Sequence, residues 1–475
     1  MNAIILAAIL GVVMMFSSVF INNKSTYKYI AIVGMIALLG VNWADTYGWR
    51  MFDIDTKGML NFSRYGYFFN TVCIAATLVY LLLSGAAFEK VGNYTAEYFA
   101  LVFFVLCGIS IITSFNTLLM LFLGVEIMSI PLYILTGADK RNLKSNEASL
   151  KYFLMGSFTT GIMLMGIALI YAATGSFNLD VSRANNVMIG TTVNLSILEV
   201  TGCILLFISL AFKVSAAPFH FWTPDVYDGA PSVFTSFMAT VIKAAGFLAL
   251  YRFFDAKVGF TGVASSPNLG VDWKLMLAIV IVLTLLAGNV TAVFQQSVKR
   301  MLAYSSIAQA GFMMMALFGN NDMAKEGLVL YALVYSLATI GIFAVLVKMK
   351  DYTFEGFNGL AKENPVIAFA TTIFLLSLAG IPLTGGFFAK YFMLASVVKT
   401  GSYLWLVVVA VLFAAISVYY YFRVIQAMYF KTATSESPVL AVTVPPLAQY
   451  AFIALAIAII IVGVWPQAVL QYLYF

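Results

Sequence analysis

Charged side chains are scarce in this sequence of 475 residues, because Asp, Glu, Lys and Arg make up only 10% of it while 62% is hydrophobic. Soluble globular chains are roughly one quarter charged, so the composition excludes a soluble protein and favours a lipid bilayer as the solvent. The 26 basic and 20 acidic residues leave a net charge of +6 without any basic run. This distribution excludes a nucleic-acid-binding surface.

Histidine and cysteine are also rare, since His220 is the only histidine and the three cysteines are far apart in sequence. Haem in a membrane bundle usually needs paired histidines, and iron–sulfur or zinc sites need clustered ligands. The cysteines, in apolar runs, are expected to be packing residues. No phosphate-binding glycine motif occurs. The sequence therefore predicts a membrane component without a cofactor of its own, driven by some other part of a system.

Long apolar runs dominate the rest of the chain and predict an all-α, multi-pass membrane protein with about 14 transmembrane helices. The first run has neither a basic flank nor a cleavage site, so we interpret it as a retained span. The expected spans are 2–21, 28–46, 63–85, 96–113, 116–137, 146–173, 194–218, 230–254, 273–294, 300–319, 325–349, 364–400 (interrupted), 402–430 and 446–470.

The basic residues give this topology a direction. Loops after odd-numbered spans, together with the helix ends beside them, hold 14 Lys and Arg residues, and those after even-numbered spans hold 9. Basic loops stay in the cytoplasm, so the odd-numbered loops are expected there and both termini on the opposite side. The three remaining basic residues lie inside spans.

These three lysines and one glutamate lie where a charge is most costly, about 2.5–3.5 kcal/mol at a helix centre on insertion scales. They are Glu126 in the fifth span, Lys213 in the seventh, Lys243 in the eighth and Lys390 in the twelfth. Such residues usually mark proton or ion pathways. A buried lysine loses its proton more readily, whereas a nearby carboxylate stabilises its charge. Arginine always stays protonated. The lysines are therefore candidate proton-transfer groups, although structural ion pairs or lysines that reach the interface remain alternatives.

Two of the four residues lie beside predicted helix breaks. Pro218 follows Lys213, and Pro382 to Gly386 precede Lys390. Broken helices beside ionisable groups are typical of transport sites, where protein or water satisfies the freed backbone groups. His220 comes two residues after the first break. It is a possible proton relay, or alternatively a satisfied buried histidine.

Several weaker polar features accompany these residues. Lys299 and Arg300 are typical of an ordinary cytoplasmic anchor. Asp225 and Asp228 are expected to be loop and capping carboxylates. The remaining polar residues are candidates to hold water in the tenth span or to line the break in the twelfth; they are Tyr304, Ser305, Ser306, Gln309, Ser377 and Thr384.

The two breaks predict an internal duplication. They fall in the seventh and twelfth spans, so two five-span units, spans 4–8 and 9–13, would each carry a break in fourth place. An odd number of spans inverts the second unit in the membrane, as in ion-coupled transporters. The expected segments are a three-span portion at 1–95, the two repeats at 96–254 and 273–430, and a final span at 446–475.

Five segments of the sequence resemble the antiporter-like subunit N of respiratory complex I, whose mitochondrial counterpart is NADH dehydrogenase subunit two. They are LFLGVEIMSIPLYILTG, SNEASLKYFLMGSF, KVSAAPFHFWTPDVYDGAPSVFTSFMATVIKAAGF, QQSVKRMLAYSSIAQAGF and GIPLTGGFFAKYFML. The resemblance runs from about residue 98 to 430, while residues 22–96 give no strong motif. It implies proton-transfer roles for Glu126, Lys213, Lys243 and Lys390, with His220 as a link.

The resemblance also implies a non-redox, proton-translocating subunit of an NADH:quinone oxidoreductase in the bacterial inner membrane, with both termini periplasmic. Its partners would be other antiporter-like and small hydrophobic membrane-arm subunits. Flavin, iron–sulfur clusters and quinone would belong to other subunits. The alternatives are a subunit of a multisubunit sodium/proton antiporter, an inert membrane scaffold, and a metabolite transporter.

Overall fold

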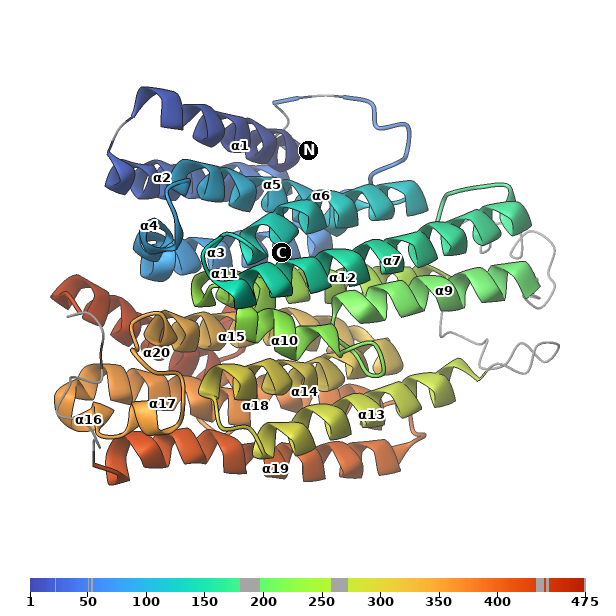
Figure 1. The fold of residues 1–475 in the computed structure, drawn as a ribbon. Helices are drawn as coiled ribbons and strands as arrows, with labels where there is room; N and C mark the ends of the chain where they lie inside the picture. The colour runs from blue at the N-terminus through green and yellow to red at the C-terminus, as the bar shows by residue number, and fades with distance from the viewer. Residues whose placement is uncertain are drawn as a thin grey trace.

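The computed structural model describes residues 1–21, 23–49, 51–52, 54–179, 197–257, 272–432, 440 and 444–473. Within these ranges the chain is helical and contains isolated bridges but no strand. The long helices lie side by side along one common direction (Figure 1). Eleven helical stretches are long and apolar enough to cross a membrane, or twelve if the bent pair at the C-terminal end counts as one span. The prediction of an all-helical, multi-pass membrane protein is confirmed.

The helices follow one another in the order that the apolar runs predict. The first are α1 (Asn2–Phe20), α2 (Lys24–Thr46), α3 (Arg64–Ser84), α4 (Phe88–Val91), α5 (Thr95–Ser114), α6 (Leu118–Thr136) and α7 (Leu143–Thr174). The central ones are α9 (Ile197–Lys213), α10 (Trp222–Gly229), α11 (Ser232–Phe237), the π-helix η2 (Met238–Ile242) and α12 (Lys243–Lys257). The last are α13 (Trp273–Val293), α14 (Val298–Gly319), α15 (Asp322–Leu346), α16 (Leu360–Glu363), α17 (Pro365–Ala379), α18 (Gly385–Val398), α19 (Leu404–Phe430), α20 (Pro446–Val464) and α21 (Gln467–Leu470), with short 3₁₀ turns at Gly85–Ala87, Glu355–Phe357 and Gln471–Leu473.

Short polar side chains fix where many of these helices begin. A side-chain oxygen at the N-cap accepts a hydrogen bond from a backbone N–H of the first turn, which has no helical partner. This cap starts α3 at Ser63, α6 at Thr117, α14 at Ser297 and α15 at Asn321. The short loops thus determine the helix register, although the spans themselves are almost uniformly apolar.

Two expected spans are interrupted. Between α9 and α10 the chain leaves the helix after Lys213, and between α17 and α18 it does so after Ala379. Each break holds a residue that is not glycine in the left-handed region, Ser215 at φ 64° and Leu383 at φ 71°. Such conformations cost of order 1–3 kcal/mol and concentrate at functional sites. The predicted breaks are therefore confirmed at both places.

The most deeply buried helices lie at the centre of the molecule. The stretch Ser232–Ala256, which combines α11, η2 and α12, is wholly buried, and α14 and α15 are almost so, while α1, α2 and α19 are largely exposed. Figure 1 shows α1 and α2 at one edge of the bundle and α19 at the other, with α14 and α15 between them. Other helices shield the central ones from lipid, so these can hold polar groups.

Candidate functional site

Lys213 is the last residue of α9, and its side chain is buried against α6. Its Nζ donates a hydrogen bond to the Ser129 hydroxyl at 2.8 Å and a longer one to the Tyr133 hydroxyl at 3.4 Å. The same Nζ lies 5.7 Å from the centroid of the Tyr133 ring. Hydroxyl and aromatic contacts therefore satisfy a cation that hydrocarbon would not tolerate.

Glu126 lies on α6 three residues before Ser129 and is half-buried. Its Oε1 accepts a hydrogen bond from the Thr160 hydroxyl of α7 at 2.7 Å. No ion pair joins Glu126 to Lys213 in the ranges that the structure describes. The two charges are thus held by separate hydroxyl groups. Glu126 and Ser129, the partner of Lys213, lie about one helical turn apart along α6.

Lys243 follows the π-helix η2 directly and is only 1% exposed. Its Nζ donates hydrogen bonds to two atoms of Ser306 on α14, the carbonyl oxygen at 2.8 Å and the hydroxyl at 3.1 Å. Single π-helical turns inside α-helices occur frequently at functional sites. Lys243, in the wholly buried stretch Ser232–Ala256, therefore contacts the central helix α14.

Lys390 lies on α18, and its ammonium reaches back across the second break. Its Nζ donates a hydrogen bond to the carbonyl oxygen of Ala379, the last residue of α17, at 2.8 Å. It also lies 4.8 Å from the centroid of the Phe312 ring. A helix C-terminus carries partial negative charge and unpaired carbonyl oxygens. The broken helix therefore supplies the electrostatic partner of this lysine.

A small cavity of about 10 Å³ adjoins Lys390, with Gln309, Tyr331 and Tyr335 also in its wall. This volume suits about one water molecule. The Gln309 side chain donates to the Leu378 carbonyl oxygen at 2.9 Å and accepts a hydrogen bond from the Tyr331 hydroxyl. Sequence reasoning proposed Gln309 as a water-holding residue, and the structure places it beside the twelfth-span lysine.

Tyr335 lies between the surroundings of the two central lysines. It lines the cavity next to Lys390, and its hydroxyl also lies near Ser306, which binds Lys243. No motif in the sequence singled out Tyr335, because one tyrosine in an apolar span has no distinguishing pattern. Lys243, Ser306, Tyr335 and Lys390 therefore make a succession of neighbouring polar groups across the centre of the molecule. We call this succession the polar connection; its hydrogen bonds are those between Lys243 and Ser306, and the Tyr335 hydroxyl has no partner.

His220 lies outside this connection. It sits between α9 and α10 with its ring 5.1 Å from that of Phe221, and it is half-buried. Its Nδ1 has no hydrogen-bond partner. None of the hydrogen bonds formed by the three lysines involves His220. Its role as a relay stays a prediction.

Lys299, expected to be part of an ordinary cytoplasmic anchor, turns towards the protein interior. It is only 3% exposed, and its Nζ donates to the carbonyl oxygens of Asp228 at 2.8 Å and Ala230 at 2.6 Å. Those carbonyls belong to the C-terminal end of α10, which attracts a cation. The sequence did not predict this burial, because a pair of adjacent basic residues does not reveal that only one of them turns inward.

Arg300 is the outward-facing residue of that pair. It forms ion pairs with Asp225 at 3.1 Å and Asp228 at 4.0 Å, and Asp225 also pairs with Lys151 of α7 at 3.0 Å. The carboxylates expected to be loop groups thus tie α7, α10 and α14 together. These ion pairs are partly exposed, so each contributes only about 0–1 kcal/mol.

A cavity of about 400 Å³ lies beside Lys299 at the same end of the helices. All of its wall comes from the ends of spans next to loops that follow odd-numbered spans, so we call it the odd-loop cavity. It is lined by Ala87, Lys90, Val91, Asp139, Asn142, Lys144, Asp228, Gly229, Ala230, Pro231, Ser232, Val233, Lys299, Val347 and Tyr352.

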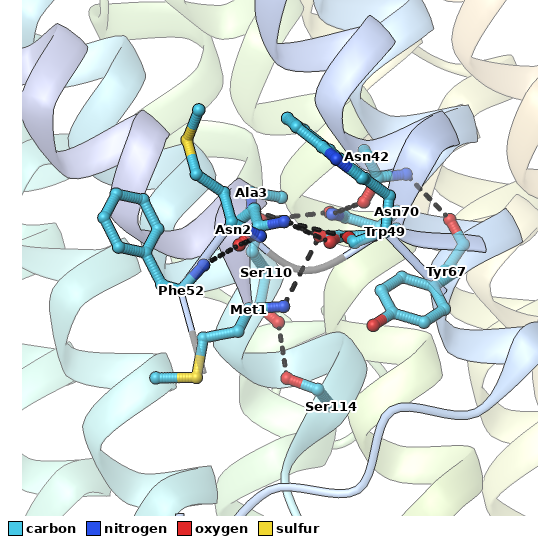
Figure 2. Close-up of polar contacts among 12 residues, drawn as sticks. Met1, Asn2, Ala3, Asn42, Trp49, Phe52, Tyr67, Asn70, Ser110 and Ser114 are labelled. Carbon is cyan, nitrogen blue, oxygen red and sulfur yellow. Dashed lines mark hydrogen bonds and ion pairs between the residues drawn. The ribbon is translucent and has the colours of Figure 1, made fainter. Parts of the chain in front are cut away.

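A separate polar cluster joins the first helices, where the sequence showed only spans (Figure 2). The Asn2 amide donates to the buried Asp45 carboxylate at 2.8 Å. Deeper in the bundle, the Asn70 amide donates to the Asn42 side chain at 2.7 Å, and the Ser110 hydroxyl donates to Asn70 at 3.3 Å. These bonds connect α1 with α2, α2 with α3, and α3 with α5. Polar contacts of this kind hold helices together in lipid.

Within the described ranges, no group of three or more His, Cys, Asp or Glu side chains gathers as it would to hold a metal ion. Cys73, Cys107 and Cys203 are buried and form no disulfide.

Comparison with known proteins agrees with this picture. The family model described as "NADH:quinone oxidoreductase/Mrp antiporter, TM" matches residues 114–417. The NADH-quinone oxidoreductase subunit N of Cytophaga hutchinsonii is 41% identical over 478 aligned residues, which cover 99% of each chain. This chain belongs to the NADH-quinone oxidoreductase subunit N family. Its likeness to other family members extends over the first 95 residues, where the sequence itself gave no motif.

Solved structures place the subunit N fold among membrane-arm proteins. A chain of respiratory complex I from Thermus thermophilus with bound aureothin superposes with a TM-score of 0.81 at 31% identity, covering 99% of this chain and 98% of that one. A chain of the Mrp complex from Dietzia sp. DQ12-45-1b gives a TM-score of 0.79 at 19% identity, covering 100% and 96%. The second likeness, at this identity, shows a shared fold alone.

Proposed function

We propose that this chain is a proton-translocating membrane-arm subunit of a complex I-type NADH:quinone oxidoreductase. The observation that carries the proposal is the polar connection from Lys243 through Ser306 and Tyr335 to Lys390. An inert scaffold would gain stability if apolar residues replaced these buried groups. Membership of the subunit N family supports assembly into such a complex, and the buried lysines are the groups that would carry protons.

Proton transfer in this proposal passes between amines. A neutral Lys243 accepts a proton and becomes an ammonium that the Ser306 carbonyl and hydroxyl stabilise. The proton then moves through Tyr335 and water in the small cavity to Lys390, whose ammonium the α17 C-terminus stabilises. Hydroxyl groups can donate and accept at once, so they can pass a proton without carrying a charge of their own.

Glu126 and Lys213 form the driving element of the proposed mechanism. In this structure Lys213 binds Ser129, and Glu126 binds Thr160. A movement of about one helical turn along α6 would bring ammonium and carboxylate together. At about 4 Å and an effective dielectric of about 20, such a pair gains about 4 kcal/mol. Events elsewhere in the complex that favour or break this pair would change whether Lys213 holds its proton.

The finer topology belongs to the same proposal. The eleven long stretches and the bent pair α20–α21 make twelve spans. If α9–α10 and α17–α18 each form one broken span, the total is fourteen and the inverted repeats are spans 4–8 and 9–13. Both breaks support the repeat, because Lys213 ends α9 while Lys390 binds the end of α17. A lysine thus accompanies each break, although the Lys213 ammonium binds side chains of α6 and the Lys390 ammonium binds the end of α17.

The surroundings of the chain follow from the assembly. Other antiporter-like and small hydrophobic subunits would cover its lipid-facing helices, and both termini would face the periplasm of a bacterial inner membrane. Flavin, iron–sulfur clusters and quinone would be bound by other subunits and would carry out the electron transfer. The segments 1–95, 96–254, 273–430 and 446–475 would be the N-terminal portion, the two repeats and the last span.

The test uses the assembled complex in sealed vesicles with NADH as electron donor. Lys213→Ala, Lys243→Ala and Lys390→Ala should each lower the number of protons pumped per electron pair. Lys399→Ala is the matched control, because Lys399 follows α18 directly but is exposed. Normal proton stoichiometry in all three variants would disprove the proposal. Sodium-dependent exchange without NADH would instead favour the antiporter alternative.

A further inference from the structure

Three lysines from distant parts of the sequence gather at the end of the helices where the odd-loop cavity lies. They are Lys28 on α2, Lys90 on α4 and Lys348, which follows α15. The charge of Lys348 is within electrostatic reach of the other two. The Lys28 Nζ donates a hydrogen bond to the Leu82 carbonyl oxygen at 3.2 Å, near the end of α3 that leads to α4. Figure 1 shows α4 at the same end of the bundle as the start of α2. We call these three residues the lysine cluster.

The surroundings of the lysine cluster disfavour its charges. Lys28 and Lys348 are half-buried, and the Lys348 Nζ lies 5.8 Å from the centroid of the Phe452 ring of α20. Burial and the two neighbouring positive charges lower the pKa of Lys348. Both desolvation and a like charge make a charged amine less favourable. The chain therefore brings cations together at a place where its own groups do not stabilise them.

The chain supplies no anion to compensate the lysine cluster. Among the residues that the structure describes, no carboxylate forms an ion pair with any of the three lysines, although Glu89 attracts Lys28 from a longer distance. The Ser84 hydroxyl, only 2% exposed, also lacks a hydrogen-bond partner. Ser84 precedes Gly85, where a Cβ would lie 3.3 Å from the Lys28 Cγ. Because buried polar groups normally have partners, an anion with hydrogen-bonding oxygens fits this place.

The odd-loop cavity gives a ligand room beside Lys90, which lines it. Asp139 and Asp228 line the same cavity and would repel an anion within it. The anion is therefore expected on the side of Lys90 where Lys28 and Lys348 lie.

The helices next to the lysine cluster favour a lipid as the source of the anion. α2 exposes the apolar side chains of Tyr29 and Val33, each 66% exposed, and α20 exposes Ile457 and Ile461, each 50% exposed. Acyl chains can lie along such faces while the phosphate stays at the helix ends. Basic pockets between membrane helices on the cytoplasmic side bind phospholipid headgroups, and the lysine cluster lies next to loops that are expected on that side.

We propose that Lys28, Lys90 and Lys348 bind the phosphate group of an anionic phospholipid in the leaflet on the odd-loop side. The three ammonium groups donate charge-assisted hydrogen bonds to its oxygens, and the phosphate supplies the charge that the chain lacks. This site goes beyond the proposed function, because it requires no proton transfer through the central lysines.

The first experiment maps the lipid directly. The assembled complex is placed in phosphatidylcholine nanodiscs with a small fraction of phosphatidylglycerol that carries a photoreactive diazirine beside its headgroup. After illumination, mass spectrometry should find the label in the segments 82–93 and 345–352. A lysine near the membrane surface strengthens anionic-lipid binding about fivefold, so Lys28→Gln, Lys90→Gln and Lys348→Gln together should lower this labelling more than about tenfold.

The matched control removes three charges elsewhere on the same side. Lys140→Gln, Lys350→Gln and Lys362→Gln together change exposed lysines next to loops after odd-numbered spans, and they should leave the labelling unchanged. Equal labelling in the two triple variants would overturn the proposal. If the first triple variant does not assemble, Lys348→Gln alone should lower the labelling about fivefold, and unchanged labelling would overturn the proposal equally.

Competition distinguishes a lipid from free phosphate. Excess unlabelled phosphatidylglycerol should remove the label, whereas excess phosphatidylcholine or inorganic phosphate at constant ionic strength should not. Loss of the label in inorganic phosphate would assign the lysine cluster to a soluble anion and disprove the lipid site.

The second experiment measures the melting temperature of the complex in the same nanodiscs. Phosphatidylglycerol should raise it for the unaltered complex and not for the variant without the lysine cluster, since a ligand stabilises only a protein that binds it. In phosphatidylcholine alone that variant should melt no lower than the unaltered complex, because its like charges are gone. An equal rise in both would contradict the site. Neither experiment measures pumping, so their failure would leave the proposed function untouched.

Discussion

Lys243 and Ser306 meet at two points, because the ammonium donates to the Ser306 carbonyl oxygen at 2.8 Å and to its hydroxyl at 3.1 Å. The hydroxyl in turn donates to the Ala303 carbonyl oxygen at 2.7 Å. Ser306 therefore accepts from the lysine while its own proton is held by the backbone. This arrangement fixes the ammonium against α14, the helix that also carries Gln309 next to Lys390.

Replacing Ser306 with alanine keeps the carbonyl contact and removes the hydroxyl one. A hydrogen bond to a charged group is worth about 1.5–3 kcal/mol, and a change of about 1.4 kcal/mol in a barrier alters a rate tenfold. Ser306→Ala should therefore slow NADH-driven proton pumping by about tenfold, measured as the initial rate of acidification in sealed vesicles. Ser417→Ala is the control, because that buried hydroxyl bonds only within its own helix. Equal pumping in the two variants would argue against a role for the Ser306 hydroxyl.

Gly386 is the residue at the second break that tolerates a side chain least. A Cβ there would lie 1.7 Å from the Ser377 carbonyl oxygen, so α17 and α18 would have to separate. Gly386→Ala should displace Lys390 and cost several kcal/mol in stability, in the range of overpacked buried sites. The measurement is the melting temperature of the purified complex together with its proton stoichiometry. Gly161→Ala, where no atom lies within 4 Å, should be neutral or slightly stabilising in its helix; equal behaviour of the two variants would disprove the steric argument.

The sequence predicted the three lysines of the site because each has a high cost in hydrocarbon. It could not predict their partners, since Ser129, Ser306 and the Ala379 carbonyl are reached only through the packing of distant helices. Prolines and glycines marked both breaks for a similar local reason. The cost of burying a charge and the position of a helix break can each be predicted from a single segment. A contact between side chains depends on two segments that are distant in the sequence.

The polar cluster of the first helices shows the limit of this reasoning most clearly. Asn42, Asn70 and Ser110 are isolated polar residues in three different spans. Taken alone, each is a single polar side chain in an apolar helix and indicates no site. Only their side-by-side placement shows a chain of hydrogen bonds. The burial of Lys299 was not predicted for a related reason, because the sequence does not reveal which of two adjacent basic residues faces inward.

Lys299 gives a stability prediction of its own. Its ammonium satisfies the carbonyl oxygens of Asp228 and Ala230, and Lys299→Met would leave both buried groups without that donor. An unsatisfied buried group costs about 1–3 kcal/mol, so the melting temperature of the complex should fall clearly. Arg300→Met is the matched control, because its exposed ion pairs are worth about 1 kcal/mol or less. If the two variants have the same melting temperature, Lys299 does not hold the end of α10 in place.

Lys348 offers a prediction about pH, because it follows the end of α15 at Leu346 and lies outside that candidate span. Burial, together with the positive charges of Lys90 and Lys28, lowers the pKa of Lys348 from 10.5 to about 8. The unfolded chain therefore binds this proton more tightly than the folded chain. Raising the pH through the window from about 8 to 10.5 should favour the folded state.

The measurable consequence is the reactivity of the Lys348 amine. Only a neutral amine is acylated, and about half of the Lys348 side chains should be neutral at pH 8, the value to which the pKa is lowered. Acylation of its peptide, followed by mass spectrometry between pH 6 and pH 11 at about half-unit steps, should rise with a midpoint near 8. Lys90→Gln removes one neighbouring positive charge, so the midpoint should move to higher pH. A midpoint near 10.5 in the unaltered chain, or one that Lys90→Gln leaves in place, would contradict this electrostatic account.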